Sequence, residues 1–300
     1  MIPIKRSGAL EWGRRTYVMG ILNVTPDSFS GDGLVDGRDV TALIAEQAAA
    51  FVAAGADILD IGGESTRPGS SPVTAEEELA RVIPAIQAAR AATGDTPISI
   101  DTYRAVVAEA ALDAGADWIN DVWGLRMDPR MASLAAERNC PVVIMHNRSK
   151  PKDVAQEEQL GGRYVGVRYT DLLGDIKAEL SEQVSIALAA GVRSDQIILD
   201  PGIGFGKTVE QNLELLDRLD ELKDLGFPLL LGSSRKSFIG YTLGLPPDRR
   251  LEGTAATVAI GIARGVDIVR VHDVAAMVRV ARMTDAIVRR ALRDETESGQ

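Results

Sequence analysis

Eight short runs of apolar residues recur along the chain, and a longer segment with helical spacing separates each run from the next. The runs are rich in Ile, Val and Leu and do not alternate with polar residues, which is typical of parallel strands covered on both faces. They are Tyr17–Asn23, Asp57–Ile61, Ile98–Asp101, Trp118–Asp121, Val142–His146, Ile197–Asp200, Leu229–Gly232 and Ile268–Val271. Eight strand–helix units predict an α/β fold, a single closed (β/α)8 TIM barrel.

The junctions from helix to strand support this prediction. Gly55-Ala56-Asp57, Gly115-Ala116-Asp117 and Gly265-Val266-Asp267 repeat one pattern, in which the glycine suits the left-handed position after a helix. An open doubly wound sheet is the alternative, but the G-x-G-x-x-G fingerprint of dinucleotide-binding sheets does not follow the first run. We expect one domain over residues 1–292. Residues 293–300 are polar and lack periodicity, so we expect a disordered tail there.

Composition narrows the possible partners. The 300 residues carry a net charge of −10, which disfavours binding to nucleic acid or to an anionic membrane. Cys140 is the single cysteine, so an intrachain disulfide is excluded. The segment Met1–Arg15 does not resemble a secretory signal, and no segment reaches about 18 continuous apolar residues. We therefore expect a cytoplasmic protein that contacts neither membrane nor nucleic acid.

Polar residues stand at the carboxyl end of each predicted strand, where TIM barrels build their active sites. These residues are Asn23, Asp60, Asp101, Asn120, Asp121, His146, Asp200, Ser233, Ser234, Arg235, Lys236, Arg270 and His272. The end of a strand is itself sufficient to explain any one of them, but it explains the whole set less well. Asp101, Asn120 and Asp200 continue apolar runs, and a carboxylate near the core is costly unless something donates hydrogen bonds to it. A ligand rich in N–H groups, such as a 2-amino-4-oxo-pterin ring, would do so.

Cations gather on the same predicted face in an otherwise acidic chain: Arg67, Arg235, Lys236, Arg270 and His272. Arg and Lys at a barrel mouth suit phosphate or carboxylate, and the ends of the seventh and eighth strands form a common phosphate site. Solvated surface charge is the alternative. The chain lacks a Cys/His cluster with zinc spacing, so Mg²⁺ held mainly by the diphosphate of a ligand fits better.

The two histidines and the glycine-rich loops are less decisive. His272 lies two residues after Arg270, so both side chains would point the same way, whereas His146 is expected to be structural. The loops Ser28–Gly33 and Gly62–Gly69 are either mobile covers or ordinary turns. Pro201–Gly206 leads into Lys207, but its G-x-G-x-G-K spacing differs from that of a P-loop.

Seven motifs together resemble the bacterial dihydropteroate synthases, in the order found in that family, over about Gly8 to Arg290. They are Met19–Ser30, Asp60–Gly69, Ser99–Thr102, Ile119–Asp121, Leu199–Gly202, Ser234–Ser237 and Val269–Asp273. The resemblance implies a transferase of folate biosynthesis that condenses (7,8-dihydropterin-6-yl)methyl diphosphate with 4-aminobenzoate. In this family the diphosphate leaves first, and the aromatic amine attacks the resulting pterin-methyl cation. The first loop departs from the family pattern, reading Ser30-Gly31-Asp32-Gly33 in place of Ser-Asp-Gly-Gly.

The resemblance also implies roles for individual residues. Asp101, Asn120, Asp200 and Lys236 would bind the pterin, and Asn23, Thr66, Arg67, Arg270 and His272 the diphosphate. Ser237, Thr66 and Phe29 would contact 4-aminobenzoate. Lys236, Arg270 and Asp101 would be the catalytic residues, and Asn23 would contact Mg²⁺. The resemblance further implies a homodimer and inhibition by sulfonamides.

Two other functions stay open at this point. A methyltetrahydrofolate methyltransferase has the same pterin-binding barrel, but it should lack the pairing of Ser65–Pro68 with Ser234–Ser237, because it binds neither diphosphate nor aminobenzoate. A pterin-binding paralogue with impaired catalysis would carry damage in the first or second loop, and the shifted Asp32 is the one hint of it.

Overall fold

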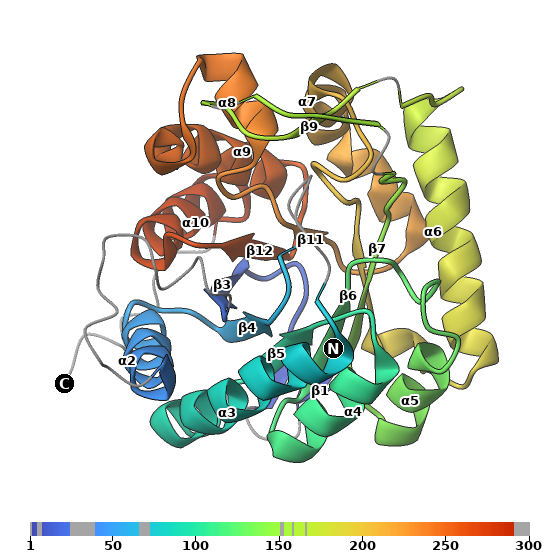
Figure 1. Cartoon of the computed structure of the whole chain (residues 1–300). Helices are drawn as coiled ribbons and strands as arrows, with labels where there is room; N and C mark the ends of the chain where they lie inside the picture. Colours follow the sequence, from blue (N-terminus) through green and yellow to red (C-terminus); the bar gives the residue numbers. More distant parts are fainter. Residues whose placement is uncertain are drawn as a thin grey trace.

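Eight parallel strands form a barrel with helices around it (Figure 1). The structure is a computed structural model that describes residues 2–4, 8–24, 40–65, 73–150, 153–157, 159–165 and 167–290. The barrel strands are β3 (Tyr17–Asn23), β4 (Ile58–Gly62), β5 (Ile98–Asp101), β6 (Trp118–Asp121), β7 (Val142–Met145), β10 (Ile197–Asp200), β11 (Leu230–Leu231) and β12 (Ile268–Val271). All eight predicted strands are present, each within one residue of the expected bounds at both ends.

The strands follow one another around the sheet in chain order, with β12 pairing in parallel with β3. The remaining seam lies between β10 and β11. A parallel bridge joins Leu199 to Leu229 there, and the Leu199 N–H donates to the Pro228 carbonyl at 2.9 Å. The sheet is therefore a nearly closed barrel, and the predicted TIM fold is confirmed.

Helices cover the outside of the barrel (Figure 1). They are α2 (Val40–Ala53), α3 (Ala75–Thr93), α4 (Ala105–Ala114), α5 (Met131–Arg138), α6 (Leu172–Ala189), α7 (Val209–Asp217), α8 (Ser237–Leu243), α9 (Leu251–Ala263) and α10 (Val274–Val288). Short 3₁₀ helices η2 (Ser194–Gln196), η3 (Leu219–Leu225) and η4 (Pro247–Arg249) lie between them. Gly55, Gly115 and Gly265 have φ of +99°, +119° and +89°, as the repeated junction predicts. None of the described helices combines the length and the apolar character that a membrane span requires.

The interior of the barrel changes from apolar to polar along the strands. Tyr17, Met19, Val143 and Leu230 pack there with Ile58, Trp118, Ile198 and Ile268. Side chains alternate along a strand, so the residue two positions further on also points inward. The residues two positions after Ile58, Trp118, Ile198 and Ile268 are Asp60, Asn120, Asp200 and Arg270. An apolar layer thus fills the amino-terminal half of the barrel, and polar groups line the mouth above it.

Two small hairpins were not expected from the sequence. β1 (Ile2–Ile4) pairs with β2 (Gly8–Leu10), and Leu10 and Trp12 pack against the apolar layer inside the barrel. The polar segment after β7 contains β8 (Val154–Ala155) paired with β9 (Arg163–Tyr164). The predicted tail at 293–300 lies outside the described residues, and the single-domain assignment stays a prediction.

Candidate active site

Four polar side chains from four strands meet inside the barrel mouth. Arg270 donates from Nε to Asp60 Oδ2 and from Nη2 to Asp101 Oδ2, each at 2.6 Å. Asn120 Nδ2 donates to the same oxygen of Asp60 at 3.2 Å. Asp60 is fully buried, and its other oxygen, Oδ1, has no hydrogen-bond partner among the described residues. The mouth therefore holds a guanidinium between two acids, with an acceptor to spare.

The electrostatics of this cluster make Asp101 unusual. Burial raises the pKa of Asp101 to about 7, against the opposing charge of Arg270, and the charge of Asp60 adds to the rise. Arg270 uses Nε and Nη2 to hold the acids, so Nη1 is the guanidinium nitrogen left for an incoming anion. A site with this composition can bind a polar ring through its acids and a phosphate group through its arginine.

A second group of polar residues lies at the end of β10. Asp200 is almost fully buried, and its Oδ1 accepts a hydrogen bond from the Gly202 N–H at 2.7 Å. Burial raises the pKa of Asp200, and Lys236 opposes this rise. Lys236 Nζ donates to the Ile203 carbonyl and lies 4.4 Å from the centre of the Phe205 ring. Burial lowers the pKa of Lys236 to about 8, with Asp200 opposing the shift.

The turn that positions Lys236 has a strained backbone. Arg235 has a φ of +56°, in the left-handed region that non-glycine residues rarely adopt. Its N–H donates to Thr254 Oγ1 at 3.0 Å, and its carbonyl accepts from Arg250 Nη1 at 3.0 Å. This turn leaves Lys236 as the N-cap of α8 and Ser237 as the first residue of that helix.

Two of the predicted cations have partners at the end of the barrel wall. His272 Nδ1 lies 3.0 Å from Ser234 Oγ, just beyond β12. Arg235 Nε donates to Asp273 Oδ2 at 2.9 Å, and its side chain is 42% exposed. Arg235 therefore forms an ion pair at the surface. For this cation, solvated surface charge is the better explanation than a phosphate site.

The predicted site residues do not all fall within these two groups. Asn23 ends β3 at the mouth and is partly buried. Phe29, Thr66 and Arg67, together with the altered Gly31-Asp32 order, lie outside the described residues. The structure brings Asp101, Asn120 and Arg270 into one group, and Asp200 and Lys236 into the other.

Sequence reasoning missed three participants. Asp60 was noted at a strand end, but its contact with Arg270 was not anticipated; a carboxylate within the apolar run Ile58–Gly62 was the available signal. Phe205 under Lys236 had no signal beyond its position in a glycine-rich loop. Lys207 follows that loop and is buried rather than facing a ligand.

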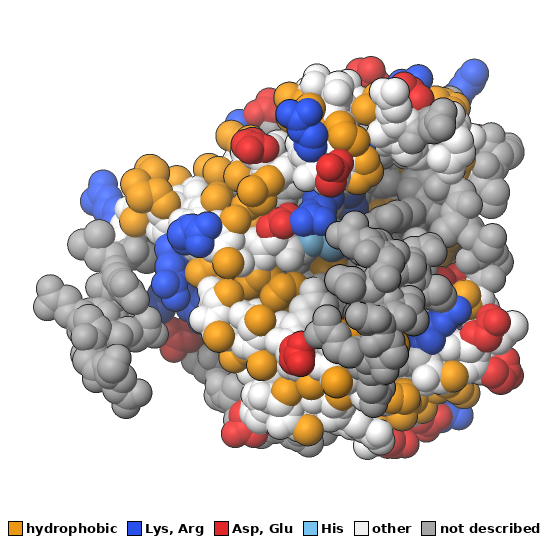
Figure 2. Space-filling view, turned by 60° about the vertical axis from the view of Figure 1, so that its left-hand side comes forward, with side chains coloured by type: hydrophobic (Ala, Val, Ile, Leu, Met, Phe, Trp, Pro, Cys, Tyr) orange, Lys and Arg blue, Asp and Glu red, His pale blue; other side chains and the backbone are white. Residues whose placement is uncertain are grey.

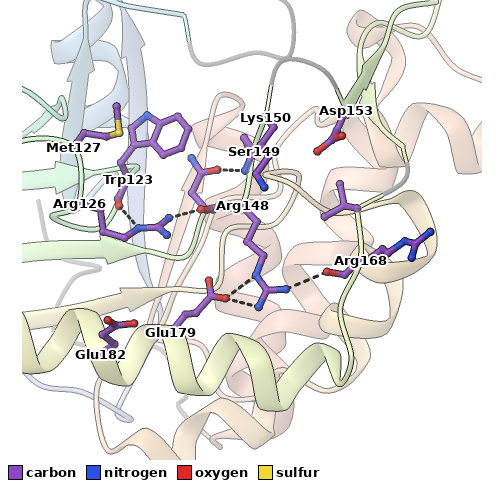
Figure 3. Close-up of a pocket in the computed structure, with 12 residues that line it drawn as sticks. Trp123, Arg126, Met127, Arg148, Ser149, Lys150, Asp153, Arg168, Glu179 and Glu182 are labelled. Carbon is purple, nitrogen blue, oxygen red and sulfur yellow. Dashed lines mark hydrogen bonds and ion pairs between the residues drawn. The ribbon is translucent and has the colours of Figure 1, made fainter.

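A cavity of about 750 Å³ opens outside the barrel mouth, between the loops after β6 and β7 and helix α6 (Figure 3). Trp123, Arg126, Arg148, Arg168 and Glu179 are among its lining residues. Arg148 and Glu179 are in direct contact in its lining (Figure 3), where Arg148 Nε donates to Glu179 Oε1 at 2.6 Å. None of the predicted site residues lines this cavity, so we place the candidate active site in the barrel mouth.

Comparisons with known proteins identify the family to which the chain belongs. A family model for pterin binding enzymes matches residues 19–272. A dihydropteroate synthase from Bacillus subtilis is 50% identical over 94% of this chain and 92% of its own length. The chain therefore belongs to the pterin binding enzyme family, among its dihydropteroate synthases.

Solved structures are similar over most of the chain. A Clostridium difficile dihydropteroate synthase determined in the presence of pteroic acid has a TM-score of 0.83 and 50% identity, covering 94% of this chain and 100% of that one. A Xanthomonas albilineans enzyme with 4-aminobenzoic acid has a TM-score of 0.81 and 40% identity, covering 93% and 94%. A Yersinia pestis enzyme in a sulfonamide complex has a TM-score of 0.82 and 39% identity, covering 95% and 98%.

Proposed function

We propose that the barrel mouth condenses (7,8-dihydropterin-6-yl)methyl diphosphate with 4-aminobenzoate, giving 7,8-dihydropteroate and diphosphate. The chain is a transferase of folate biosynthesis, as its relatives are. The observation that carries the proposal is the pairing of buried acids with Arg270 and Lys236 in one mouth. Acids can accept hydrogen bonds from the N–H edge of a pterin, and cations can hold its diphosphate.

We assign the pterin to Asp101, Asn120, Asp200 and Lys236. The ring would lie above the apolar layer of the barrel, where Asp200 is fixed by the Gly202 N–H and Lys236 by the Ile203 carbonyl. Carboxylates next to the ring would also stabilise positive charge that develops at the pterin methylene as the diphosphate leaves. Such stabilisation requires ionised acids, so the raised pKa of Asp101 ties this step to pH.

The diphosphate is assigned to Arg270 and His272, with Asn23 beside them and Thr66 and Arg67 from the second loop. Arg270 would donate from Nη1 while Asp60 and Asp101 hold its other nitrogens. Negative charge grows on the diphosphate as the bond breaks, and a guanidinium held in place beforehand stabilises that charge without reorganising.

Mg²⁺ is proposed as the cofactor. Among the described residues no group of three His, Cys, Asp or Glu side chains is placed to hold a metal ion. The amide oxygen of Asn23 at the end of β3 fits an ion that takes its other ligands from the diphosphate and water. A bound Mg²⁺ would neutralise part of the charge on the leaving group.

The second substrate is assigned to Ser237, Thr66 and Phe29, with the carboxylate of 4-aminobenzoate at Ser237. An aniline is neutral at pH 7 and attacks without prior loss of a proton, so we assign no single general base. The Xanthomonas albilineans structure with 4-aminobenzoic acid supports this substrate. The Yersinia pestis structure with a sulfonamide supports our proposal that sulfonamides are inhibitors.

We also propose a homodimer and a cytoplasmic location. Exposed apolar side chains support the dimer: Leu251 and Ile260 on α9, and Met283 and Ile287 on α10, are 39% to 66% exposed. Figure 2 shows many hydrophobic side chains on the face that this view brings forward. Light scattering of the purified chain tests the dimer, and fractionation of the source cells tests the location.

One assay tests the reaction. The chain is supplied with the dihydropterin diphosphate, 4-aminobenzoate and Mg²⁺, and both dihydropteroate and released diphosphate are measured. The proposal expects the two products in equal amounts. Tight pterin binding without product would instead identify a catalytically impaired paralogue. The methyltransferase alternative is not favoured, because the Bacillus subtilis relative and the Clostridium difficile structure are dihydropteroate synthases.

A further inference from the structure

Lys207 is buried at the centre of the segment that follows β10. It is 2% exposed and among the largest side chains that are wholly enclosed. Its Nζ lies 2.9 Å from His146 Nδ1, 2.9 Å from the Gly202 carbonyl and 3.1 Å from the Phe205 carbonyl. The two carbonyls accept hydrogen bonds from the amine, and the contact with His146 completes its set of partners. Burial lowers the pKa of Lys207 well below its usual value, with the charge of Asp200 opposing the shift. A buried lysine is costly, and such complete satisfaction indicates that it serves a purpose at this place.

The His146 ring lies between Lys207 and Glu179. Its Nδ1 forms a hydrogen bond with the Lys207 amine whose direction depends on the ring tautomer, and Nε2 lies 3.1 Å from Glu179 Oε2 at ion-pair distance rather than in a well-aligned hydrogen bond. Arg148 in turn holds Glu179 (Figure 3). Burial lowers the pKa of His146 to about 3, and the nearby Lys207 adds to the effect. His146 therefore stays uncharged at neutral pH.

The two carbonyls held by Lys207 belong to the loop that orients the pterin site. Gly202 donates its N–H to Asp200, and Ile203 accepts from Lys236. The Phe205 ring lies beneath Lys236 Nζ. The loop also packs directly on the end of β7, since a Cβ at Gly202 would lie 1.8 Å from the His146 carbonyl oxygen. Any loosening of this loop would move both Asp200 and Lys236.

We infer that Lys207 is a positioning residue, which with His146 clamps the loop at 201–206 so that Asp200 and Lys236 face the pterin. This role is separate from the groups that touch substrate, because the Lys207 amine is enclosed by protein on the inner side of the loop. The inference rests on the proposed function, since it concerns how tightly the pterin is held.

Lys207→Met tests the clamp, because methionine keeps much of the side-chain volume and removes the donor. Binding of pteroic acid is measured by calorimetry, which requires no turnover, together with Tm. We expect binding about 10- to 100-fold weaker than in the unaltered chain, the range typical of a displaced binding group.

Lys223→Met is the matched control. Lys223 forms an ion pair with the buried Asp267, 3.2 Å away at the amino-terminal end of the barrel, so its loss should affect Tm and not pteroic acid binding. If Lys207→Met lowers Tm while pteroic acid binds within about twofold of the unaltered chain, Lys207 is merely structural and the inference is overturned.

A second pair of variants keeps the inference testable if Lys207→Met fails to fold. His146→Asn keeps an amide group near the position of Nδ1 that can bond to the Lys207 amine, whereas His146→Leu removes this partner. We expect pteroic acid binding to be largely retained in the Asn variant and lost in the Leu variant; equal binding by the two contradicts the clamp. Failure of the unaltered chain itself to bind pteroic acid would count against the proposed function instead.

Discussion

The two ends of the barrel use aspartate in opposite ways. At the amino-terminal end, Asp57, Asp117 and Asp267 each accept a hydrogen bond from the backbone N–H of a neighbouring strand, at 2.8 to 3.0 Å. Each also pairs with a cation, which is Arg15, Arg90 or Lys223. At the mouth, Asp60 and Asp101 share a single arginine, and one oxygen of Asp60 has no hydrogen bond to a described residue.

This difference indicates that the acids at one end of the strands stabilise the fold and that those at the other end serve the candidate site. Asp57 and Asp60 are three residues apart, yet the first joins two strands and the second lies in the candidate active site. Acids whose oxygens are matched within the protein stabilise the barrel, whereas acids left short of donors are available to a ligand. The comparison predicts that mouth variants lose activity at little cost in stability, and that amino-end variants do the reverse.

The largest effect is expected for Lys236→Ala. The change removes a cation that neighbours Asp200 and the pterin site, so kcat/KM for dihydropteroate formation should fall by about 100-fold or more. Tm should change little. Lys177→Ala, which breaks an exposed ion pair with Asp224 on the outside of the barrel, is the control. Near-normal rates in Lys236→Ala would show that the pocket is misassigned.

Asp101 should give the stability a pH dependence. An acid whose pKa is raised from 3.8 to about 7 binds its proton more tightly when folded. Its contribution to stability is therefore complete below about pH 4 and is lost as the pH rises through about 7, with a slope of up to about 1.4 kcal/mol per pH unit. Urea unfolding between pH 5 and 8 should show the unaltered chain losing stability relative to Asp101→Asn as the pH rises. Parallel curves for the two proteins would contradict this.

Asp267→Asn should have a smaller effect, and it should lower stability rather than activity. Asp267 accepts from the N–H groups of Gly13 and Leu229 through its two oxygens, and asparagine has only one oxygen to offer. We expect a loss of about 1–3 kcal/mol in the free energy of unfolding, measured with urea, and a Tm lower by a few degrees. kcat should be unchanged below the melting range. A drop in kcat would contradict the assignment of stability to the amino-terminal end and activity to the mouth.

The smallest effect is expected for Arg15→Met. Its side chain is 49% exposed, so the ion pair with Asp57 is screened by water and should contribute less than about 1 kcal/mol. Asp57 would keep its hydrogen bond from the Val18 N–H. A loss of stability as large as that of Asp267→Asn would show that the exposed cation, and not the backbone contact, makes these aspartates stabilising.

The sequence predicted the barrel well because its strands are covered on both faces. Runs such as Ile98–Asp101 and Ile268–Val271 are read directly from their Ile and Val content, and they match the structure residue for residue. The short strand β11 was the least accurate, since only Leu230 and Leu231 pair along its length. The hairpin of β8 and β9 has two residues in each strand, too few to leave a periodic pattern.

The site was predictable as a set of residues but not as a set of contacts. Strand ends bring Asp101, Asn120 and Arg270 to one mouth in any TIM barrel. The pairing of Arg270 with Asp60, 210 residues earlier in the chain, depends on β12 closing against β3. The burial of Lys207 could not be predicted from the sequence either. A lysine suggests an exposed cation, and only its contacts with His146 and the loop carbonyls explain why it is buried.

The apolar layer within the barrel also determines how ligands travel. Met19, Trp118 and Ile198 fill the amino-terminal half of the barrel, and Leu10 and Trp12 pack against this layer. Ligands can therefore enter and leave only through the mouth at the carboxyl ends of the strands. We therefore expect the ligand that lies deeper to bind first and to leave last, because a ligand above it would block its exit. The shape of the described part of the barrel would by itself impose this order of binding and release.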